Sequence, residues 1–373
     1  LNQRDRDVYD DFANGVDVDR YTIDGELTPV VVGVRELGNA SNESWERRHA
    51  RFTHGYGMVL APANEFNVNG QPEFLIRDAP VENDIADSIE LTRPQVYFGD
   101  GVAGYAVVNT TSEEFGFIPG YSYNGRGGVP IGGFFRRLAF AFRFSALEPL
   151  ISGIITDETE VIYERDVTER ARRLAPFLKF DSDPYPVVSN GGIKYVIDAY
   201  TTSDMYPYAE RANVSQVSPG ADLRHNFNYF RNSVKVVVDG FDGTVDFYVV
   251  DPNEPILSAY RKAFPDLFKT KDDPLFTDEL VAHLRYPEDL FRIQTNMWAT
   301  YQLDEAAEFF DDTAAWTVAI DPGRELDSGG TSQTTTATGL TTVTTGDRIA
   351  PHYVQMRLPG EEDQEFLILR PFV

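Results

Sequence analysis

The stretch NSVKVVVDGFDGTVDFYVVD, residues 232–251, is the part of this chain that says most about its fold. Apolar side chains occupy alternate positions on both sides of a DGFDG turn, and successive side chains of a strand point to opposite faces of a sheet. Asp-Gly steps favour hairpin turns because glycine adopts positive φ without strain. We therefore expect an antiparallel hairpin. The alternating positions are Val234, Val236 and Val238 before the turn and Val245, Phe247 and Val249 after it.

The rest of the chain mixes strand-like and helix-like segments without regular alternation. Asp166 or Thr168 suits the cap of one helix, and Pro255 suits the first turn of another. The mixture indicates an α+β fold with mainly antiparallel sheets. Strands are predicted at 28–37, 73–77, 95–98, 104–109, 186–189 and 193–199, and helices at 42–51, 133–148, 166–176, 255–268 and 287–311.

Composition divides the chain into five parts. Residues 1–125 form a β-rich N-terminal part, and residues 126–180 hold a Gly-rich turn and a helical segment. Residues 181–320 form an α+β part that includes the hairpin at 232–251. Residues 321–348 are rich in Thr and Gly with little to bury, which predicts a flexible excursion. Residues 349–373 contain strand-like stretches that are expected to return to the sheet.

Acidic residues dominate the charge balance. The chain has 59 Asp and Glu against 33 Lys and Arg, a formal net charge of −26, and only six of the basic residues are lysine. Acidic surfaces with few lysines suit concentrated salt, where self-repulsion is screened over a few ångströms. We therefore expect a salt-adapted source. So negative a surface also argues against nucleic-acid binding, which relies on Lys and Arg to neutralise phosphates.

Cysteine is absent, which excludes disulfides, thiolate metal sites and cysteine nucleophiles. No run reaches the roughly 18 apolar residues of a membrane-spanning helix. The chain begins with Leu1 rather than Met, and no secretory signal pattern follows. We expect a water-soluble piece of a longer or processed protein.

The stretch NGRGGVPIGGFFRRLAFAFRF, residues 124–144, has the layout of a phosphate cradle, with glycines leading into a helix. It is not a Rossmann fingerprint, because Pro130 stands where the third glycine belongs, and it lacks the Lys and hydroxyl residue of a P-loop. The glycines are better explained by a tight turn that packs against the helix. A backbone nest beside Arg126, Arg136 and Arg137 keeps these three as candidates for anion or membrane contact.

The helical end of this stretch, FFRRLAFAFRF, is apolar on most sides with arginines at three positions. A membrane-surface helix has this composition. A buried helix whose arginines pair with carboxylates has it too, and we expect the buried arrangement.

Catalytic signals are weak. No G-x-S-x-G motif is present, and carboxylates are too numerous for any pair to be informative, so no catalytic residue and no cofactor site is predicted. The five histidines lack metal-ligand spacing, although His54 and His283 could join distant carboxylates at a metal. Candidate N-glycosylation sequons begin at Asn39, Asn42, Asn109 and Asn213.

Several longer stretches carry a resemblance to uncharacterised protein family 0182, large polytopic membrane proteins of bacteria and archaea. They occur in order along most of the chain and include VDVDRYTIDGELTPVVVGVREL (16–37), WERRHARFTHGYGMVLAPANE (45–65), GGVPIGGFFRRLAFAFRF (127–144) and HLRYPEDLFRIQ (283–294). The resemblance implies transmembrane helices followed by a soluble C-terminal region outside the cytoplasm, with this chain as that region. It supplies no catalytic residues, and the Thr-rich insert at 328–346 departs from the family pattern.

Three functions are compatible with these observations. The first is a non-catalytic extracytoplasmic domain of an integral membrane protein, which contacts envelope proteins, lipids or its own absent transmembrane region. The second is a metal-dependent envelope hydrolase or transferase, and the third is an extracellular ligand-binding module. The sequence leaves the partner and the oligomeric state undetermined.

Overall fold

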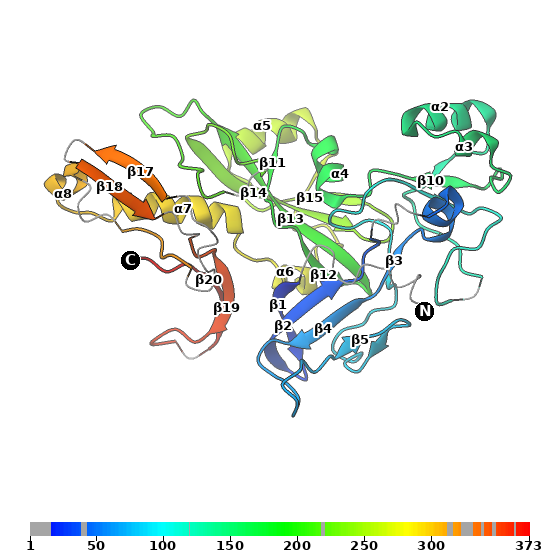
Figure 1. The fold of residues 1–373 in the computed structure, drawn as a ribbon, viewed down its shortest axis with the longest axis horizontal. Helices are drawn as coiled ribbons and strands as arrows, with labels where there is room; N and C mark the ends of the chain where they lie inside the picture. The colour runs from blue at the N-terminus through cyan, green and yellow to red at the C-terminus, as the bar shows by residue number, and fades with distance from the viewer. Residues whose placement is uncertain are drawn as a thin grey trace. The chain divides into compact units, whose positions relative to one another are not determined.

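The computed structural model describes residues 16–38, 43–118, 120–217, 221–311, 316–321, 331–336, 339–344, 348–361 and 363–373. The chain folds into two compact units (Figure 1). The first unit comprises residues 1–202 and 230–285, and the second comprises residues 203–229 and 286–373. The five-part division expected from composition stays a prediction.

The central sheet of the first unit contains the hairpin. Val234, Val236 and Val238 stand opposite Val249, Phe247 and Val245 in an antiparallel ladder, so the expected hairpin is confirmed. The sheet has six strands: β11 (Lys179–Phe180), β13 (Gly192–Ser203), β14 (Tyr229–Asp239), β15 (Val245–Val249) and β16 (Phe268–Lys269) in that order, with β12 (Tyr185–Ser189) paired to β13. Its β15–β16 pair is parallel.

Smaller antiparallel sheets complete the β-structure of this unit. One has five strands in the order β1 (Asp17–Ile23), β2 (Glu26–Val34), β4 (Met58–Pro62), β5 (Ile76–Arg77) and β6 (Glu82–Asn83). Another pairs β10 (Glu160–Ile162) with β8 (Ala106–Val108) and β9 (Val129–Pro130), and β3 (Gly55–Tyr56) pairs with β7 (Gln95–Val96).

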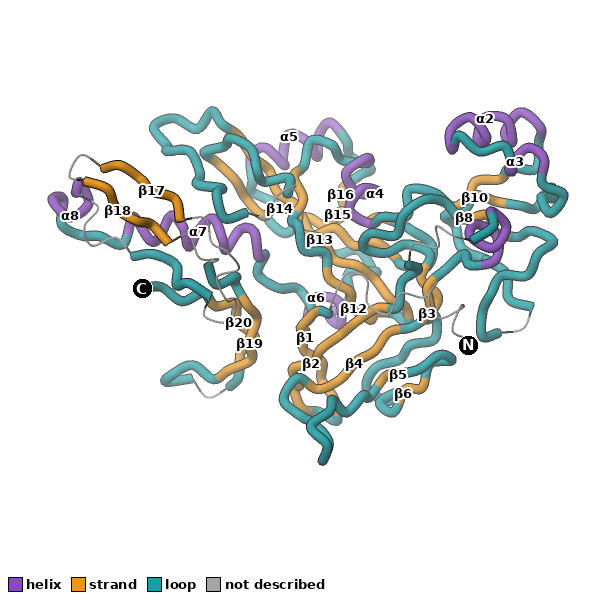
Figure 2. Tube along the Cα trace, in the orientation of Figure 1, coloured by secondary structure: helices purple, strands orange, loops and turns teal. Residues whose placement is uncertain are grey.

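Short helices lie around these sheets (Figure 2). Asp166 caps α4 by accepting a hydrogen bond from the Glu169 amide, and Pro255 opens α5, as the sequence predicted. The segment expected as one helix at 133–148 is divided at Ser145, whose φ of 52° ends α2. The helices are the π-helix η1 (Arg47–Arg51), α2 (Phe134–Phe144), α3 (Glu148–Ile151), α4 (Val167–Leu174), α5 (Pro255–Ala263) and α6 (Asp278–Ala282).

The core of the first unit is filled by β-branched and aromatic side chains of the sheets. Phe98 belongs to this core and has no exposed surface. The amides of Tyr97 and Phe98 both donate to the Gly240 carbonyl, 2.8 and 2.9 Å away, which joins the chain after β7 to the hairpin turn. The Arg170 guanidinium of α4 stacks over the Phe98 ring at 4.6 Å.

The second unit is organised around α7 (Glu288–Tyr301) and is followed by α8 (Ala306–Asp311), although the sequence predicted one helix there. Arg370 is nearly buried and donates to Thr295 and Asn296 of α7 at 2.9 and 3.2 Å. β19 (His352–Met356) and β20 (Glu365–Leu369) pair with each other in a two-stranded sheet instead of extending the central sheet. The described part of the Thr-rich stretch forms the paired strands β17 (Thr331–Thr336) and β18 (Gly339–Thr344).

Helices and mainly antiparallel sheets without βαβ repetition confirm the α+β class. For the helices and strands predicted from the sequence, the type of element was correct more often than its first and last residues. The strands β1 and β4 and the short helix α6 were not predicted. The buried positions of β1, Asp19, Tyr21 and Ile23, do alternate, but a buried aspartate hides this pattern in the sequence.

Replacement of Gly243 by Ala is expected to lower the free energy of unfolding by about 2 to 4 kcal/mol, measured by urea denaturation. Gly243 has a φ of 66°, and a Cβ there would lie 2.5 Å from the buried Phe98 ring. Gly153→Ala is the control, because nothing lies within 4 Å of that position. Equal effects of the two substitutions would contradict this account of the turn.

Candidate functional site

The Gly-rich turn packs directly against its neighbours. A Cβ at Gly127 would lie 2.5 Å from the Asp242 carbonyl oxygen, and one at Gly132 would lie 2.6 Å from the Asp157 Cα. Only glycine allows backbones to approach this closely. The sequence-based explanation, a tight turn that packs close to other segments, is confirmed.

Helix α2 follows this turn and presents two apolar faces. Its inner face packs Phe140 and Phe144 against the cluster around β8 and β10, where the Phe144 ring stacks on Tyr105 at 3.8 Å. Ala141 of the same helix is buried. Its outer face carries Phe135, 83% exposed, and Phe142, 88% exposed. The expectation of a buried helix is therefore wrong for the outer face, because only one side of α2 meets the rest of the unit.

Helix α3 packs beside α2 (Figure 1), and Leu147 and Ile151 at its two ends are exposed. Positions 135, 138 and 142 share one side of α2, since residues three, four and seven apart line one face of a helix. We call this surface the α2–α3 apolar face. Its residues are Phe134, Phe135, Leu138, Phe142, Leu147 and Ile151, all with large exposed fractions.

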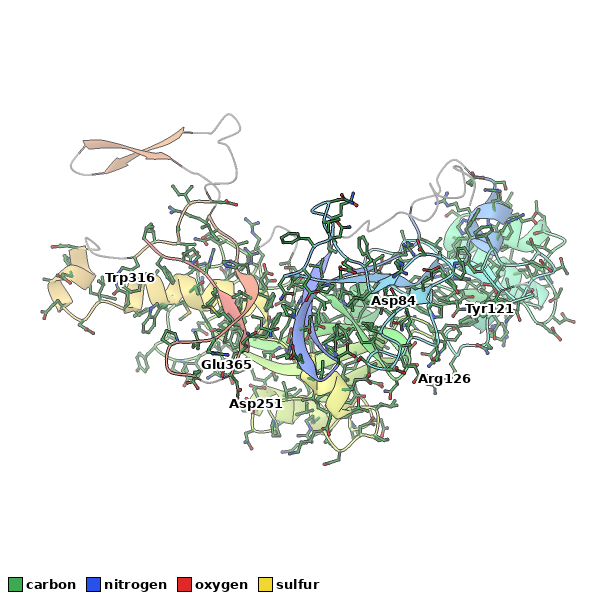
Figure 3. The ribbon with its side chains drawn as sticks, turned by 90° about the horizontal axis from the view of Figure 1, so that it is seen from below. Asp84, Tyr121, Arg126, Asp251, Trp316 and Glu365 are labelled. Carbon is green, nitrogen blue, oxygen red and sulfur yellow. The ribbon has the colours of Figure 1, made fainter. Side chains whose placement is uncertain are left out.

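The three arginines proposed for anion contact do not converge on one site. Arg126 is exposed at the surface and pairs with Asp242 at 3.2 Å (Figure 3). Arg136 donates to the Pro130 carbonyl at 3.3 Å, and Arg137 donates to Ile131 and Ile155 carbonyls at 3.4 and 3.0 Å. These contacts hold the turn and α2 in place. Whether any of the three meets an anion or a membrane stays a prediction.

Three other arginines do gather beside the Gly-rich turn. Arg143 lies in the last turn of α2, and Arg170 and Arg173 lie on α4. Together with Gly127, Tyr163 and Glu164 they line a pocket of about 470 Å³, which we call the arginine pocket. Sequence reasoning missed it because Arg143 is 27 positions from Arg170, and only the fold brings their side chains to one pocket. The run ERARR, residues 169–173, was the available signal.

The candidate metal ligands His54 and His283 have separate partners. His54 Nδ1 lies 2.8 Å from the Gly55 carbonyl oxygen, its Nε2 is buried without a described partner, and burial lowers its pKa to about 4. His283 Nδ1 lies 2.8 Å from Asp19 Oδ2. Within the described ranges, no group of three or more His, Cys, Asp and Glu side chains is arranged to hold a metal ion.

A second pocket, of about 200 Å³, is lined by four carboxyl groups. They belong to Asp17, Glu36, Asp100 and Asp183. Glu36 accepts hydrogen bonds from the Tyr195 hydroxyl and from the Asp100 amide, the latter at 2.8 Å. Burial raises the pKa of Glu36 to about 7 and that of Asp100 to about 6, with the charge of Asp166 adding to the second shift. These carboxyl groups titrate near neutral pH because they are withdrawn from water.

The substitution Glu36→Gln tests whether the raised pKa of Glu36 makes the free energy of unfolding depend on pH. The pKa of Glu36 is higher in the folded chain than its ordinary 4.5, so the folded state binds the proton more tightly. That stabilisation is complete below pH 4.5 and is lost as the pH rises through 7. Gln keeps the acceptor oxygen without the charge. The variant should therefore exceed the wild type in free energy of unfolding by about 1 to 3 kcal/mol at pH 8 and match it at pH 4.5.

Urea denaturation across this pH range measures both proteins. Glu26→Gln, on the exposed end of β2, is a matched control that should follow the wild type at every pH. A constant difference between Glu36→Gln and the wild type from pH 4.5 to pH 8 would rule out a shifted carboxyl at this position.

Two of the four sequons lie in the described residues. Asn213 is exposed, and Asn109 is half-buried with a φ of 58°. Asn39 and Asn42 lie outside the described residues. Glycosylation at these sites stays a prediction.

The fold and the pockets define an α+β protein that places a basic pocket beside an exposed apolar helix face. Comparison with known proteins gives its family. The model of an uncharacterised protein family, UPF0182, matches residues 2–373. UPF0182 proteins of Methanospirillum hungatei, Desulforamulus reducens and Trichodesmium erythraeum are similar, at 39%, 36% and 35% identity over 96%, 98% and 96% of the chain. The chain belongs to the UPF0182 family, as the resemblance predicted.

The chain spans 37 to 38% of the length of these three relatives. Their descriptions name no activity. No solved structure matches the chain. Among the helices of the described residues, none combines the length and the apolar composition needed to cross a membrane.

Proposed function

We propose that this chain is the extracytoplasmic C-terminal region of a longer membrane protein of the cell envelope, and that its α2–α3 apolar face contacts the lipid bilayer. The exposed face is the observation that carries the proposal. Large apolar surfaces that the folded chain leaves uncovered mark interaction sites. Phe135 and Phe142 are more exposed than a core role would allow.

Charge favours a lipid bilayer as the occupant of this face. Residues 126–155 contain four arginines and one glutamate, in a chain whose net charge is −26. Phenylalanines and leucine on one helix face, with arginines at its borders, suit the interface between acyl chains and anionic head groups. An acidic protein would repel such a membrane everywhere except at a local basic region.

The other parts of the proposal rest on the family and the composition. The unmatched length of the relatives leaves room for a membrane-embedded region, and the acidic, lysine-poor composition suits a salt-adapted source. We assign the chain a contact role without catalysis and without a cofactor.

Flotation with phosphatidylglycerol vesicles tests the contact with lipid. The double variant Leu138→Glu and Phe142→Glu places two charges on the outer face of α2 and leaves the inner face unchanged. We expect the wild type to float with the vesicles. The partition coefficient of the variant should be at least tenfold lower, because placing a charge among the acyl chains costs a few kcal/mol. Circular dichroism should show an unchanged fold.

Val68→Glu is the matched control, since Val68 is exposed in a turn far along the chain from α2. It should bind vesicles as the wild type does. Equal loss in the control, or no vesicle binding by the wild type, would overturn the proposal. A wild-type dimer that the double variant converts to monomer, without vesicle binding, would assign the face to a second copy of the chain.

A further inference from the structure

We infer that the arginine pocket is a binding site for a phosphate group carried by a small molecule or a lipid head group. The inference rests on the pocket's charge, its volume and the arrangement of its donors. It goes beyond the contact role of the α2–α3 apolar face and can be tested without any membrane.

The pocket is positive within a strongly negative chain. Arg143, Arg170 and Arg173 supply three positive charges, and Glu164 supplies the single negative charge among the lining residues. The pocket therefore has a net charge of about +2 while the chain as a whole has −26. Clustered arginines that are in excess of carboxylates suit an anion, and their planar forks match phosphate oxygens.

Glu164 pairs with two of the arginines. Its two carboxylate oxygens pair with Arg143 and with Arg173, the latter at 3.0 Å. The side chains of Arg143 and Arg173 are 46% and 58% exposed, so water reaches their guanidinium groups. Each guanidinium has five N–H donors. One carboxylate uses only part of this capacity, so Arg143 and Arg173 retain donors for a ligand.

Arg170 provides the fixed wall of the pocket. Its Nε donates to the Gly243 carbonyl at 2.6 Å, and its Nη1 lies 3.3 Å from the carbonyls of Tyr163 and Glu164. Among the described residues it forms no ion pair with a carboxylate, and its Nη2 has no described partner. A charged donor held by carbonyls is preorganised for an anion, because no side chain needs to move when the ligand arrives.

The size and walls of the pocket suggest what accompanies the phosphate. Its volume of about 470 Å³ is within the usual range for small-molecule sites. Val129, Tyr163 and Leu174 supply apolar wall beside the arginines. A phosphate ester of glycerol or of a similar small alcohol fits this combination. A neighbouring pocket shares Arg143 and Glu164 but adds Asp166 and Glu169, so its charge does not favour an anion.

Isothermal titration calorimetry with sn-glycerol 3-phosphate tests the site in the whole chain at constant ionic strength. We expect saturable binding with one ligand per chain. Arg143→Gln and Arg173→Gln should each weaken it about tenfold or more, because each removes charged hydrogen bonds to the phosphate. Arg172→Gln is the matched control, since Arg172 lies on the same helix, pairs with Glu169 and does not line the pocket.

Glu164→Gln adds a readout that loss of structure would not reproduce. Gln keeps the size of the side chain and removes the competing charge, so the affinity for glycerol 3-phosphate should rise severalfold. Arg170 is unsuitable as a test, because its contacts with Gly243 and Phe98 belong to the fold. Circular dichroism of every variant confirms folding.

Several outcomes would overturn the inference. These are absence of binding by the wild type, equal weakening in Arg172→Gln, equal binding of glycerol and glycerol 3-phosphate, or weaker binding in Glu164→Gln. If the site binds the soluble ester, flotation separates the two sources. Flotation with phosphatidylglycerol vesicles that Arg173→Gln weakens and that soluble glycerol 3-phosphate competes away assigns the phosphate to a head group. Flotation that neither changes assigns it to a soluble molecule.

Discussion

The buried ring of Phe98 is the constraint on which the rest of the first unit depends. The backbone of Gly127 and that of Gly243 both lie against it, at positions where a Cβ would approach the ring to 2.8 and 2.5 Å. The Arg170 guanidinium covers it at 4.6 Å. One side chain thus holds the Gly-rich turn, the hairpin turn and α4 together. The arginine pocket lies where these segments meet, so its geometry follows from the packing around Phe98.

Buried charges in this acidic chain are held by arginine forks and by backbone carbonyls. Arg285 pairs with Asp17 and Asp183 at 2.7 Å each and stacks over the Tyr185 ring at 3.8 Å. Arg165 is buried and donates to the carbonyls of Tyr97 and Thr53 at 2.7 Å. Lys235 is buried as well, where it pairs with Asp198 and donates to the Arg285 carbonyl at 2.8 Å. Each buried cation thus has several acceptors that offset its loss of hydration.

The α2–α3 apolar face and the arginine pocket are joined by α2 itself. Phe142 is on the outer face, and Arg143 follows it and reaches the pocket. A single helix end therefore connects an apolar surface with a basic cavity. This connection gives a physical reason to consider a phospholipid as one source of the phosphate, because such a molecule has both an acyl part and an anionic head.

Features that depend on short stretches of the chain were predicted correctly from the sequence. The alternation around DGFDG, the Asp166 cap, Pro255 in a first turn and the close-packing role of the glycines all depend on residues near one another in the chain. Helix ends were predicted less well. The helix break at Ser145 comes from a left-handed φ, and no glycine or proline in the sequence indicates it. The family was also recognisable, because stretches along most of the chain carry it.

Only the tertiary structure decided which face of α2 is covered and which arginines share a pocket. FFRRLAFAFRF is apolar on both sides, so its periodicity could not say that Phe140 packs inward while Phe142 stays exposed. Arg126, Arg136 and Arg137 were chosen for their closeness in sequence to the glycines, and they bind local carbonyls or Asp242. Arg143, Arg170 and Arg173 line one pocket because Glu164, which follows β10, pairs with Arg143 of α2 and with Arg173 of α4. The residues that line this pocket are far apart in the sequence, so only folding determines which charges lie in it.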